Sequence, residues 1–205
     1  MKGLVEAKES KAKRFKIGLL WKIIPAVVIV VGLFISLILA YILPDVENAL
    51  YEEKKIATKN EVLSAWTILQ HYYDMEKTGA LTKDQAQEQA KAAIGALRYG
   101  PEMTDYFFVI DFRPYMIVHP MKKELVNTDI ATYKDAQGTY MFQNMMQIAK
   151  DQKEGFTSYQ WQYKNDTTRI VPKLSYVKEF EPWGWIVGSG IYTVDVQEAT
   201  QAMQT

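Results

Sequence analysis

The sequence predicts an α+β protein in which a five-stranded antiparallel sheet carries a long N-terminal helix and is preceded by one transmembrane helix. Three observations support this. Residues 23–43 contain no charged side chain, residues 45–78 have an uninterrupted helical pattern, and the second half holds short runs rich in β-branched and aromatic residues. With 205 residues, the chain is long enough for one substantial domain and a short additional element.

The uncharged run 23–43 has 21 residues, rich in Val, Ile and Leu. At about 1.5 Å per helical residue, such a run matches a bilayer core of about 30 Å. Pro25 lies in the first turn, and Pro44 is expected to end the helix. We interpret the run as an uncleaved transmembrane helix. A cleaved signal peptide is the alternative, although its apolar region would be shorter and would end in small residues.

The charge of the chain is unevenly distributed. Residues 1–22 hold seven Lys or Arg and two Glu, a formal charge of +5, so the remainder carries −5 because the total is zero. The positive-inside rule therefore places residues 1–22 in the cytoplasm and the chain after Pro44 outside it. An acidic body also argues against binding of nucleic acid.

Two helices are expected after the membrane segment. Residues 45–78 contain no Gly or Pro, and apolar residues such as Leu63, Trp66 and Leu69 recur at helical spacing until Gly79. A second helix is expected to begin near Thr82 and to extend to about Tyr99, before Gly100 and Pro101. The short connection predicts that these helices are antiparallel.

The following residues predict the sheet. Strands are expected at 105–111 and 115–119 as a hairpin, a helix at 139–150, and strands at 155–163, 170–180 and 185–192. This order implies a five-stranded antiparallel sheet with the long helix on one face. A terminal helix is expected from about Val194 to Thr205.

The last predicted strand has glycines that leave one of its faces bare. Because side chains alternate along a strand, Gly188 and Gly190 share a face with Ile186 and Tyr192. Glycine inside a strand indicates close approach of a ligand or backbone, or a bulge. The run alone equally fits a helix packed tightly across the gap. Within the predicted sheet, close packing beside a pocket is our interpretation.

The residues give little support to catalysis. The chain has two histidines and no cysteine, and it contains no metal motif, nucleophile elbow or phosphate-binding glycine loop. Asp105 and Asp111 are expected to be solvated residues at strand ends. We therefore expect no enzyme, no catalytic residue, no metal and no cofactor.

Several cationic side chains lie in apolar surroundings. Lys173 alternates with Ser175 in an apolar strand, so it lies either at an exposed edge or in a pocket where its charge needs an anion. Arg98 is expected to end a helix, where a basic residue commonly compensates the dipole. His119 ends an apolar strand and by itself is more typical of a satisfied histidine than of a ligand contact. Tyr159 and Trp161 share one face of their strand.

An ordered set of motifs resembles one family. The chain is similar to the single Cache domain, type 2 (sCache_2), of bacterial chemoreceptors and sensor kinases over about residues 45–200. That family has a long N-terminal helix and a PAS-like antiparallel sheet. The motifs that carry the resemblance are Leu97-Arg98-Tyr99, Asp105 to Asp111, Met116 to Pro120, Lys134 to Gly138, Gly155 to Trp161, Pro172 to Val177 and Trp183 to Tyr192. Where such domains often have Gly-Thr-Gly, this chain has Ser189 between its glycines.

The resemblance implies a sensor for chemotaxis or signal transduction that binds a small organic ligand, commonly a short carboxylate such as acetate, propionate, lactate or pyruvate. It places Arg98, His119 and Lys173 near the ligand carboxylate. The hydrogen-bonding or apolar walls would be Tyr106, Tyr159, Trp161 and Tyr176. Charge-assisted donors in an enclosed site and aromatic walls suit such a ligand.

The resemblance also implies a domain organisation and a location. We expect a cytoplasmic segment at 1–22, a transmembrane helix at 23–43, an extracytoplasmic single Cache sensory domain at 44–193, and a C-terminal helix at 194–205 that leads toward a second membrane segment. The protein would lie in the bacterial inner membrane as a homodimer, with its sensory domain in the periplasm or outside the cell. The second membrane segment and the output module are not in this sequence, so we expect either a truncated receptor or a stand-alone sensor with a signalling partner.

Two other functions are weighed against this one. The first is a ligand-independent Cache-like scaffold that dimerises through its long helix. The second, an enzyme, is more distant because no nucleophile with a base, acid pair or metal set emerges from the sequence.

Overall fold

A computed structural model describes residues 21–202, with side chains described up to residue 199. Residues 1–20 of the predicted cytoplasmic segment and residues 203–205 of the predicted terminal helix lie outside the described residues. The chain has two compact units, Met1–Asn48 and Ala49–Thr205.

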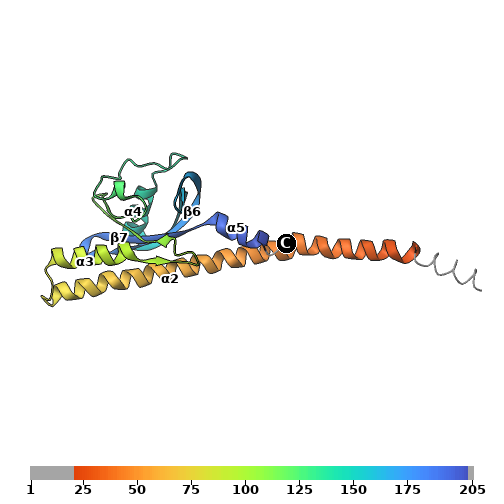
Figure 1. Ribbon diagram of the computed structural model, residues 1–205, viewed down its shortest axis with the longest axis horizontal. Coiled ribbons are helices and arrows are strands. Elements are labelled where there is room, and N and C mark those ends of the chain that lie inside the picture. Colours follow the sequence, from red (N-terminus) through yellow and green to blue (C-terminus); the bar gives the residue numbers. More distant parts are fainter. Residues whose placement is uncertain (1–20, 203–205) are drawn as a thin grey trace, which may run out of the picture. The chain divides into compact units, whose positions relative to one another are not determined.

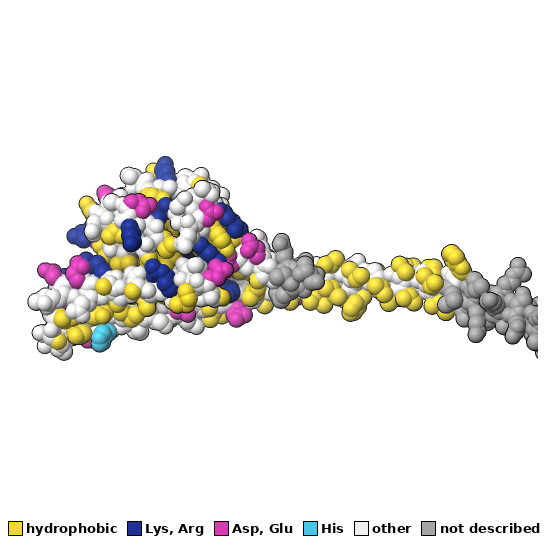
Figure 2. Space-filling model, in the orientation of Figure 1, with side chains coloured by type: hydrophobic (Ala, Val, Ile, Leu, Met, Phe, Trp, Pro, Cys, Tyr) yellow, Lys and Arg dark blue, Asp and Glu magenta, His cyan; other side chains and the backbone are white. Residues whose placement is uncertain are grey.

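The described part of the first unit is helical. Residues 21–37 are α-helix, Ile38–Ile42 form a π-helical turn (η1), and α2 (Leu43–Lys77) begins directly after it. Length and composition make the helix a candidate membrane span, and hydrophobic side chains predominate on its visible surface (Figure 2). The expectation that Pro44 ends a helix is wrong. Pro44 lies in the first turn of α2, just after the wide π-helical turn, where its missing N–H is tolerated.

The second unit begins with the two predicted helices, the remainder of α2 and α3 (Lys83–Ala96), which lie side by side (Figure 1). Thr82 begins α3 as predicted: its hydroxyl accepts from the Gln85 N–H at 3.3 Å, and the Gln85 side chain accepts from the Thr82 N–H at 2.9 Å. The helix ends at Ala96, earlier than predicted, because the backbone of Leu97 is extended.

The five-stranded antiparallel sheet predicted from the sequence is confirmed, with strand order β4-β3-β7-β6-β5. Its strands are β3 (Phe108–Asp111), β4 (Met116–Val118), β5 (Glu154–Tyr163), β6 (Asp166–Phe180) and β7 (Trp185–Tyr192). A small second sheet pairs β1 (Arg98–Tyr99) with β2 (Asp105–Tyr106). The strand predicted over 105–111 is therefore divided at Phe107, and its first part pairs with β1 instead of β7.

Helices cover both faces of the large sheet (Figure 1). On one face, α2 and α3 bury Val62, Leu69 and Ile94 against strand residues that include Val109 and Val187. On the other face, α4 (Met141–Gln152) buries a separate cluster. The chain then ends in α5 (Thr193–Ala202), which begins directly after β7. We refer to the two surfaces of the sheet as the α2 face and the α4 face.

Polar bonds attach α2 to the sheet at two places and to the β6–β7 turn at a third. Lys59 Nζ donates to Glu154 Oε1 at 2.9 Å, Trp66 Nε1 donates to the Glu179 carbonyl at 2.8 Å, and Trp183 Nε1 donates to Glu76 Oε2 at 2.7 Å. Polar bonds also join α5 to β5 and β6, and the Thr193 hydroxyl donates to the Pro172 carbonyl at 3.4 Å. The Tyr163 hydroxyl donates to Asp195 Oδ1 at 2.8 Å, and Arg169 forms an exposed ion pair of 3.0 Å with Glu198.

The bare face of β7 is filled by its neighbouring strands. A Cβ at Gly188 would lie 2.5 Å from Phe108 Cζ and 2.9 Å from Val177 Cγ1. A Cβ at Gly190 would lie 2.5 Å from the Leu174 carbonyl oxygen and 2.9 Å from Ser175 Cα. These glycines therefore serve close packing, as interpreted from the sequence, but the packing partners are β3 and β6, not a helix.

Candidate functional site

Strand alternation brings the predicted site residues of β5 and β6 together on the α4 face. Tyr159 pairs directly with Lys173, and Lys173 pairs with Tyr192 of β7. Trp161 lies on the same face as Tyr159, within the apolar cluster that α4 covers. Three adjacent strands thus place a lysine between two tyrosines.

Lys173 is the central charged group of this cluster. It is 2% exposed, and its Nζ donates to the Tyr106 hydroxyl at 3.3 Å. The same nitrogen lies 4.3 Å from the ring centroid of Tyr106 and 4.8 Å from that of Tyr192. Lys173 takes part in none of the ion pairs found among the described residues. A buried ammonium is therefore held by a hydroxyl and two aromatic faces in place of a carboxylate.

This environment changes the proton affinity of the lysine. Burial lowers the pKa of Lys173 to about 7, because the charged form loses its hydration, and the negative charge of Asp105 opposes that effect in part. The pKa of the Asp105 carboxyl is itself raised, mainly by burial, with Lys173 acting in the opposite direction. The Asp105 side chain is half-buried, which contradicts the expectation that it is a solvated strand-end residue.

Tyr106 connects Lys173 to the indole of Trp161. Trp161 Nε1 donates to the Tyr106 hydroxyl at 3.0 Å, so that oxygen accepts from both the indole and the ammonium. Its own proton is left to donate to the neighbouring Tyr192 hydroxyl or to a ligand. Burial raises the pKa of Tyr106 well above its usual value, which keeps the hydroxyl neutral.

His119 closes one side of the cluster. Its ring centroid lies 5.1 Å from that of Tyr106 and 5.6 Å from that of Trp161. Burial lowers the pKa of His119 to about 3, and the charges of Lys173 and Lys122 act in the same direction. Because Nδ1 accepts from the Lys122 N–H at 2.9 Å, the neutral ring carries its proton on Nε2. His119 can therefore donate a hydrogen bond but adds no charge.

Hydroxyl groups complete the polar part of the cluster. The hydroxyls of Tyr159 and Ser175 lie 2.9 Å apart, and burial raises the pKa of Tyr159. Ser189 donates to the Tyr106 carbonyl at 2.6 Å and lies 2.6 Å from the Tyr99 hydroxyl, which fixes β2 against β7. These bonds hold Tyr106 and Tyr159 in place around the lysine.

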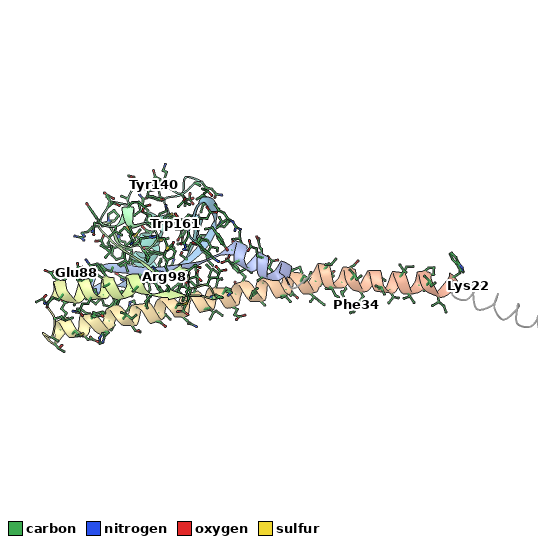
Figure 3. The ribbon with its side chains drawn as sticks, viewed as in Figure 1. Lys22, Phe34, Glu88, Arg98, Tyr140 and Trp161 are labelled. Carbon is green, nitrogen blue, oxygen red and sulfur yellow. The ribbon has the colours of Figure 1, made fainter. Side chains whose placement is uncertain are left out.

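The other two predicted site residues lie elsewhere. Arg98 lies in β1, and its Nη1 donates to the carbonyls of Gly95 at 2.9 Å and Leu97 at 2.6 Å. Tyr176 packs in the cluster on the α2 face, where its ring centroid is 5.2 Å from Lys59 Nζ. Figure 3 shows Arg98 at the level of α3 and Trp161 in the part of the domain that contains α4. The cluster thus contains Tyr106, His119, Tyr159, Trp161 and Lys173 but neither Arg98 nor Tyr176.

Sequence reasoning missed two residues at this site, Tyr192 and Asp105. Tyr192 shares the face of Gly188 and Gly190, so alternation along β7 was a usable signal for it. Asp105 and Tyr192 also line a cavity of about 290 Å³, together with Lys54 and residues of α5. The site is therefore adjacent to the surface on which α5 lies.

The acidic side chains of the described residues do not gather into a metal site. Residues 21–199 contain no group of three or more His, Asp or Glu side chains that could hold a metal ion. Asp111 was expected to be solvated, but it is buried, and its two carboxylate oxygens bond Arg113 and the N–H groups of Arg113 and Tyr115. That carboxylate therefore stabilises the β3–β4 turn.

Comparison with known proteins agrees with this architecture. The family model for Single Cache domain 2 matches residues 50–205. The chain is 36% identical to the methyl-accepting chemotaxis protein McpP of Pseudomonas putida over 172 residues, covering 84% of this chain and 30% of that protein. It is 32% identical to the sensor histidine kinase MctS of Rhizobium johnstonii over 151 residues, covering 71% of this chain and 31% of that protein. The chain thus spans about a third of the length of these relatives.

A solved structure gives the same fold. It is a Cache chemosensory domain described as recognising carboxylic acids, with a TM-score of 0.66 and 40% sequence identity, and the match covers 71% of this chain and 97% of that one. The family match extends over most of the second unit, Ala49–Thr205. From its fold and these matches, the chain belongs to the Single Cache domain 2 family, the sensor domains found in chemoreceptors and sensor kinases.

Proposed function

We propose that this protein is a membrane-anchored sensor that binds a short-chain carboxylate at the cluster around Lys173, for chemotaxis or signal transduction. One observation carries the proposal: a buried lysine ammonium has no carboxylate partner among the described residues. A buried charge without a counter-ion is costly, and an anionic ligand would remove that cost. The resemblance to a Cache domain that recognises carboxylic acids supports the same ligand class.

The neighbouring groups suit a small carboxylate. Lys173 would form a charge-assisted bond with one carboxylate oxygen, and the Tyr106 hydroxyl and the His119 Nε2–H are neutral donors beside it. The rings of Tyr159, Trp161 and Tyr192 would form the apolar wall. A site enclosed by five aromatic or imidazole rings favours ligands of two to four carbons, such as acetate, propionate, lactate and pyruvate.

The location proposed for the protein is the bacterial inner membrane. The candidate span near the N-terminus and the basic residues before it support an anchor with the sensory domain outside the cytoplasm. We also propose a homodimer formed through α2, because this helix leaves Ile56 61% exposed. A signalling partner or a further output module would receive the signal.

The proposed signal is a change in the packing of α5. Tyr192 contributes to the site, and α5 begins at the next residue, Thr193. A ligand can shift the equilibrium between two packings only by its differential affinity for them. Contact of the ligand with Tyr192 or Lys173 provides such a difference.

Calorimetry on the full chain in lipid nanodiscs tests the ligand class. We expect at least one of acetate, propionate, lactate and pyruvate to bind at pH 6, and Lys173→Met to abolish binding. Lys178→Met is the matched control: it lies on the same strand, but its side chain pairs with Glu154 on the α2 face, so ligand affinity should not change. Binding of none of the four acids, or equal affinity in Lys173→Met, contradicts the proposal.

A further inference from the structure

We infer that, at neutral pH and above, binding of a carboxylate anion is coupled to uptake of a proton by Lys173, so that the sensor responds to pH and ligand concentration jointly. This inference rests on the proposed function. It concerns the charge state of Lys173 before and after the ligand binds, and it follows from the groups that surround this amine.

Among the described residues, no carboxylate lies within ion-pair distance of the Lys173 amine. The large neighbouring side chains are neutral: Tyr106 from β2, Tyr159 from β5, Tyr192 from β7 and His119 after β4. The residues of α4 that enter this cluster are apolar: Met141, Phe142, Met145 and Ala149. The carboxylate whose charge acts on Lys173 is that of Asp105, which forms no ion pair among the described residues.

The neighbouring side chains also do not ionise near neutral pH, so they provide no negative charge beside the Lys173 amine. Burial raises the pKa of Tyr106 and Tyr159, and it raises that of Tyr192 to about 12. His119 stays neutral because its pKa is lowered to about 3. In the ligand-free site the Lys173 amine therefore loses its proton easily. With its pKa lowered to about 7, Lys173 is neutral in about half of the molecules at pH 7.

A ligand carboxylate reverses this effect. An anion within a few ångströms of Nζ favours the ammonium and raises the pKa of Lys173. Above pH 7, the neutral amine then takes a proton from solvent as the anion binds, and an ammonium–carboxylate pair forms without a net change in charge. Below pH 6 the lysine is already protonated, so the anion binds alone. The ligand and the proton therefore bind cooperatively.

The number of protons taken up per ligand follows from the pKa of Lys173. For a pKa of about 7, the neutral fraction of Lys173 is about 0.75 at pH 7.5 and about 0.1 at pH 6, and these fractions are the expected protons taken up per ligand. The dissociation constant should be nearly constant below pH 6. Above pH 8 it should rise about tenfold per pH unit, because the competent, protonated form becomes scarce.

Calorimetry in buffers of different ionisation enthalpy measures this uptake directly. The full chain in nanodiscs is titrated with acetate, propionate, lactate and pyruvate at pH 6.0 and 7.5, each in two buffers such as HEPES and Tris. At pH 7.5 the observed heat should differ between the buffers in proportion to about 0.75 proton per ligand. The difference should nearly vanish at pH 6.0. Heats that are independent of the buffer at pH 7.5, with clear binding, overturn the inference but leave the proposed function intact.

Two variants identify the residue that takes up the proton. Lys173→Arg retains a positive charge at all these pH values, so it should bind without proton uptake. Asp105→Asn removes the other group near the site that titrates, and the uptake should persist in this variant if Lys173 is the acceptor. If Lys173→Arg does not fold, the pH dependence of the wild-type dissociation constant decides: a flat profile from pH 6 to 9 rejects the inference. Failure of all four acids to bind at pH 6.0 rejects the proposed function as well.

Discussion

Lys173 and Tyr192 are direct partners across β6 and β7, and the lysine Nζ lies 4.8 Å from the centre of the tyrosine ring. Tyr192 is also the last residue of β7, and α5 begins at the next position. The charged group of the site and the start of the terminal helix are therefore connected through a single side chain. This relationship makes the charge of Lys173 relevant to both ligand binding and stability.

Removing the buried charge should stabilise the ligand-free protein. The folded-state pKa of Lys173 is about 7, below the usual lysine value of 10.5, so the unfolded chain binds the proton more tightly than the folded one. The penalty is complete below pH 7 and disappears as pH rises toward 10.5. We expect Lys173→Met to raise the free energy of unfolding by roughly 2–4 kcal/mol at pH 6 and by less at pH 9. Thermal unfolding at both pH values measures this, and a stabilisation that does not change with pH would contradict the assignment.

The Tyr106 hydroxyl should matter for ligand binding, whereas the Arg98 guanidinium should not. Tyr106→Phe removes the oxygen that bonds both Trp161 and Lys173, and we expect about tenfold weaker carboxylate binding. Arg98→Ala removes only bonds to the Gly95 and Leu97 carbonyls, so affinity should change less than about twofold. Calorimetry on both variants separates the two positions. A larger loss in Arg98→Ala than in Tyr106→Phe would move the carboxylate site toward β1.

Glu154 should contribute to stability by joining α2 to the sheet. It accepts from Lys59 of α2 at 2.9 Å and from Lys178 of β6, and the hydrogen bond from Lys178 is the main reason that its pKa is lowered to about 2. This contribution is present above about pH 4.5 and is lost as pH falls toward 2. We expect Glu154→Gln to cost about 1–2 kcal/mol at pH 7, measured by thermal unfolding.

The control for this variant is Glu52→Gln. Glu52 forms an exposed ion pair with Lys55 one turn along the same helix, at 2.9 Å, and its side chain is 59% exposed. Its replacement should leave the unfolding temperature unchanged, because exposed pairs of this kind contribute little. Equal effects of the two substitutions would show that Glu154 does not fasten α2 to the sheet.

The glycines of β7 should tolerate no side chain. An alanine Cβ at position 190 would lie 2.5 Å from the Leu174 carbonyl oxygen, so β6 and β7 would have to separate. We expect Gly190→Ala to destabilise the protein by about 2–3 kcal/mol in thermal unfolding. Gly95→Ala is the matched control: it lies in α3, and its Cβ would meet Val118 Cγ1 at an ordinary 3.5 Å. That substitution should stabilise the protein by about 0.5–1 kcal/mol.

The sequence predicts the order and type of the main elements well, because each has its own periodicity and its own stop signal. Gly79 and Thr82 mark the turn between α2 and α3 as expected, and the structure adds a capping box at Thr82. The division of the predicted strand at Phe107 has no such signal. It depends on the pairing of β2 with β1, a tertiary contact that local propensity does not contain.

The candidate site is predicted in part for similar reasons. Lys173 and Tyr159 are assigned to one pocket by the resemblance, and strand pairing explains why they meet. Tyr176 lies on the opposite face because it is an odd number of residues from Lys173 in the same strand. Strand alternation could therefore have excluded Tyr176 from the site before the structure was known. The position of Arg98 could not be predicted in this way. It depends on the extended backbone of Leu97, whereas the sequence pattern predicts that the helix continues past this residue.

The attachment of α2 to the sheet and to the β6–β7 turn has a consequence for how this domain transmits a signal. Within the second unit, α2 is bonded at Lys59, Trp66 and Glu76 and buries Val62 and Leu69 in a core cluster, whereas no described residue of α5 belongs to either core cluster. Ligand-driven motion takes place where the resisting interactions are fewest. When ligand binds, we expect α5 to move while α2 stays in place against the sheet. A spectroscopic distance measured between the two helices therefore reports the displacement of α5, with α2 as the fixed reference.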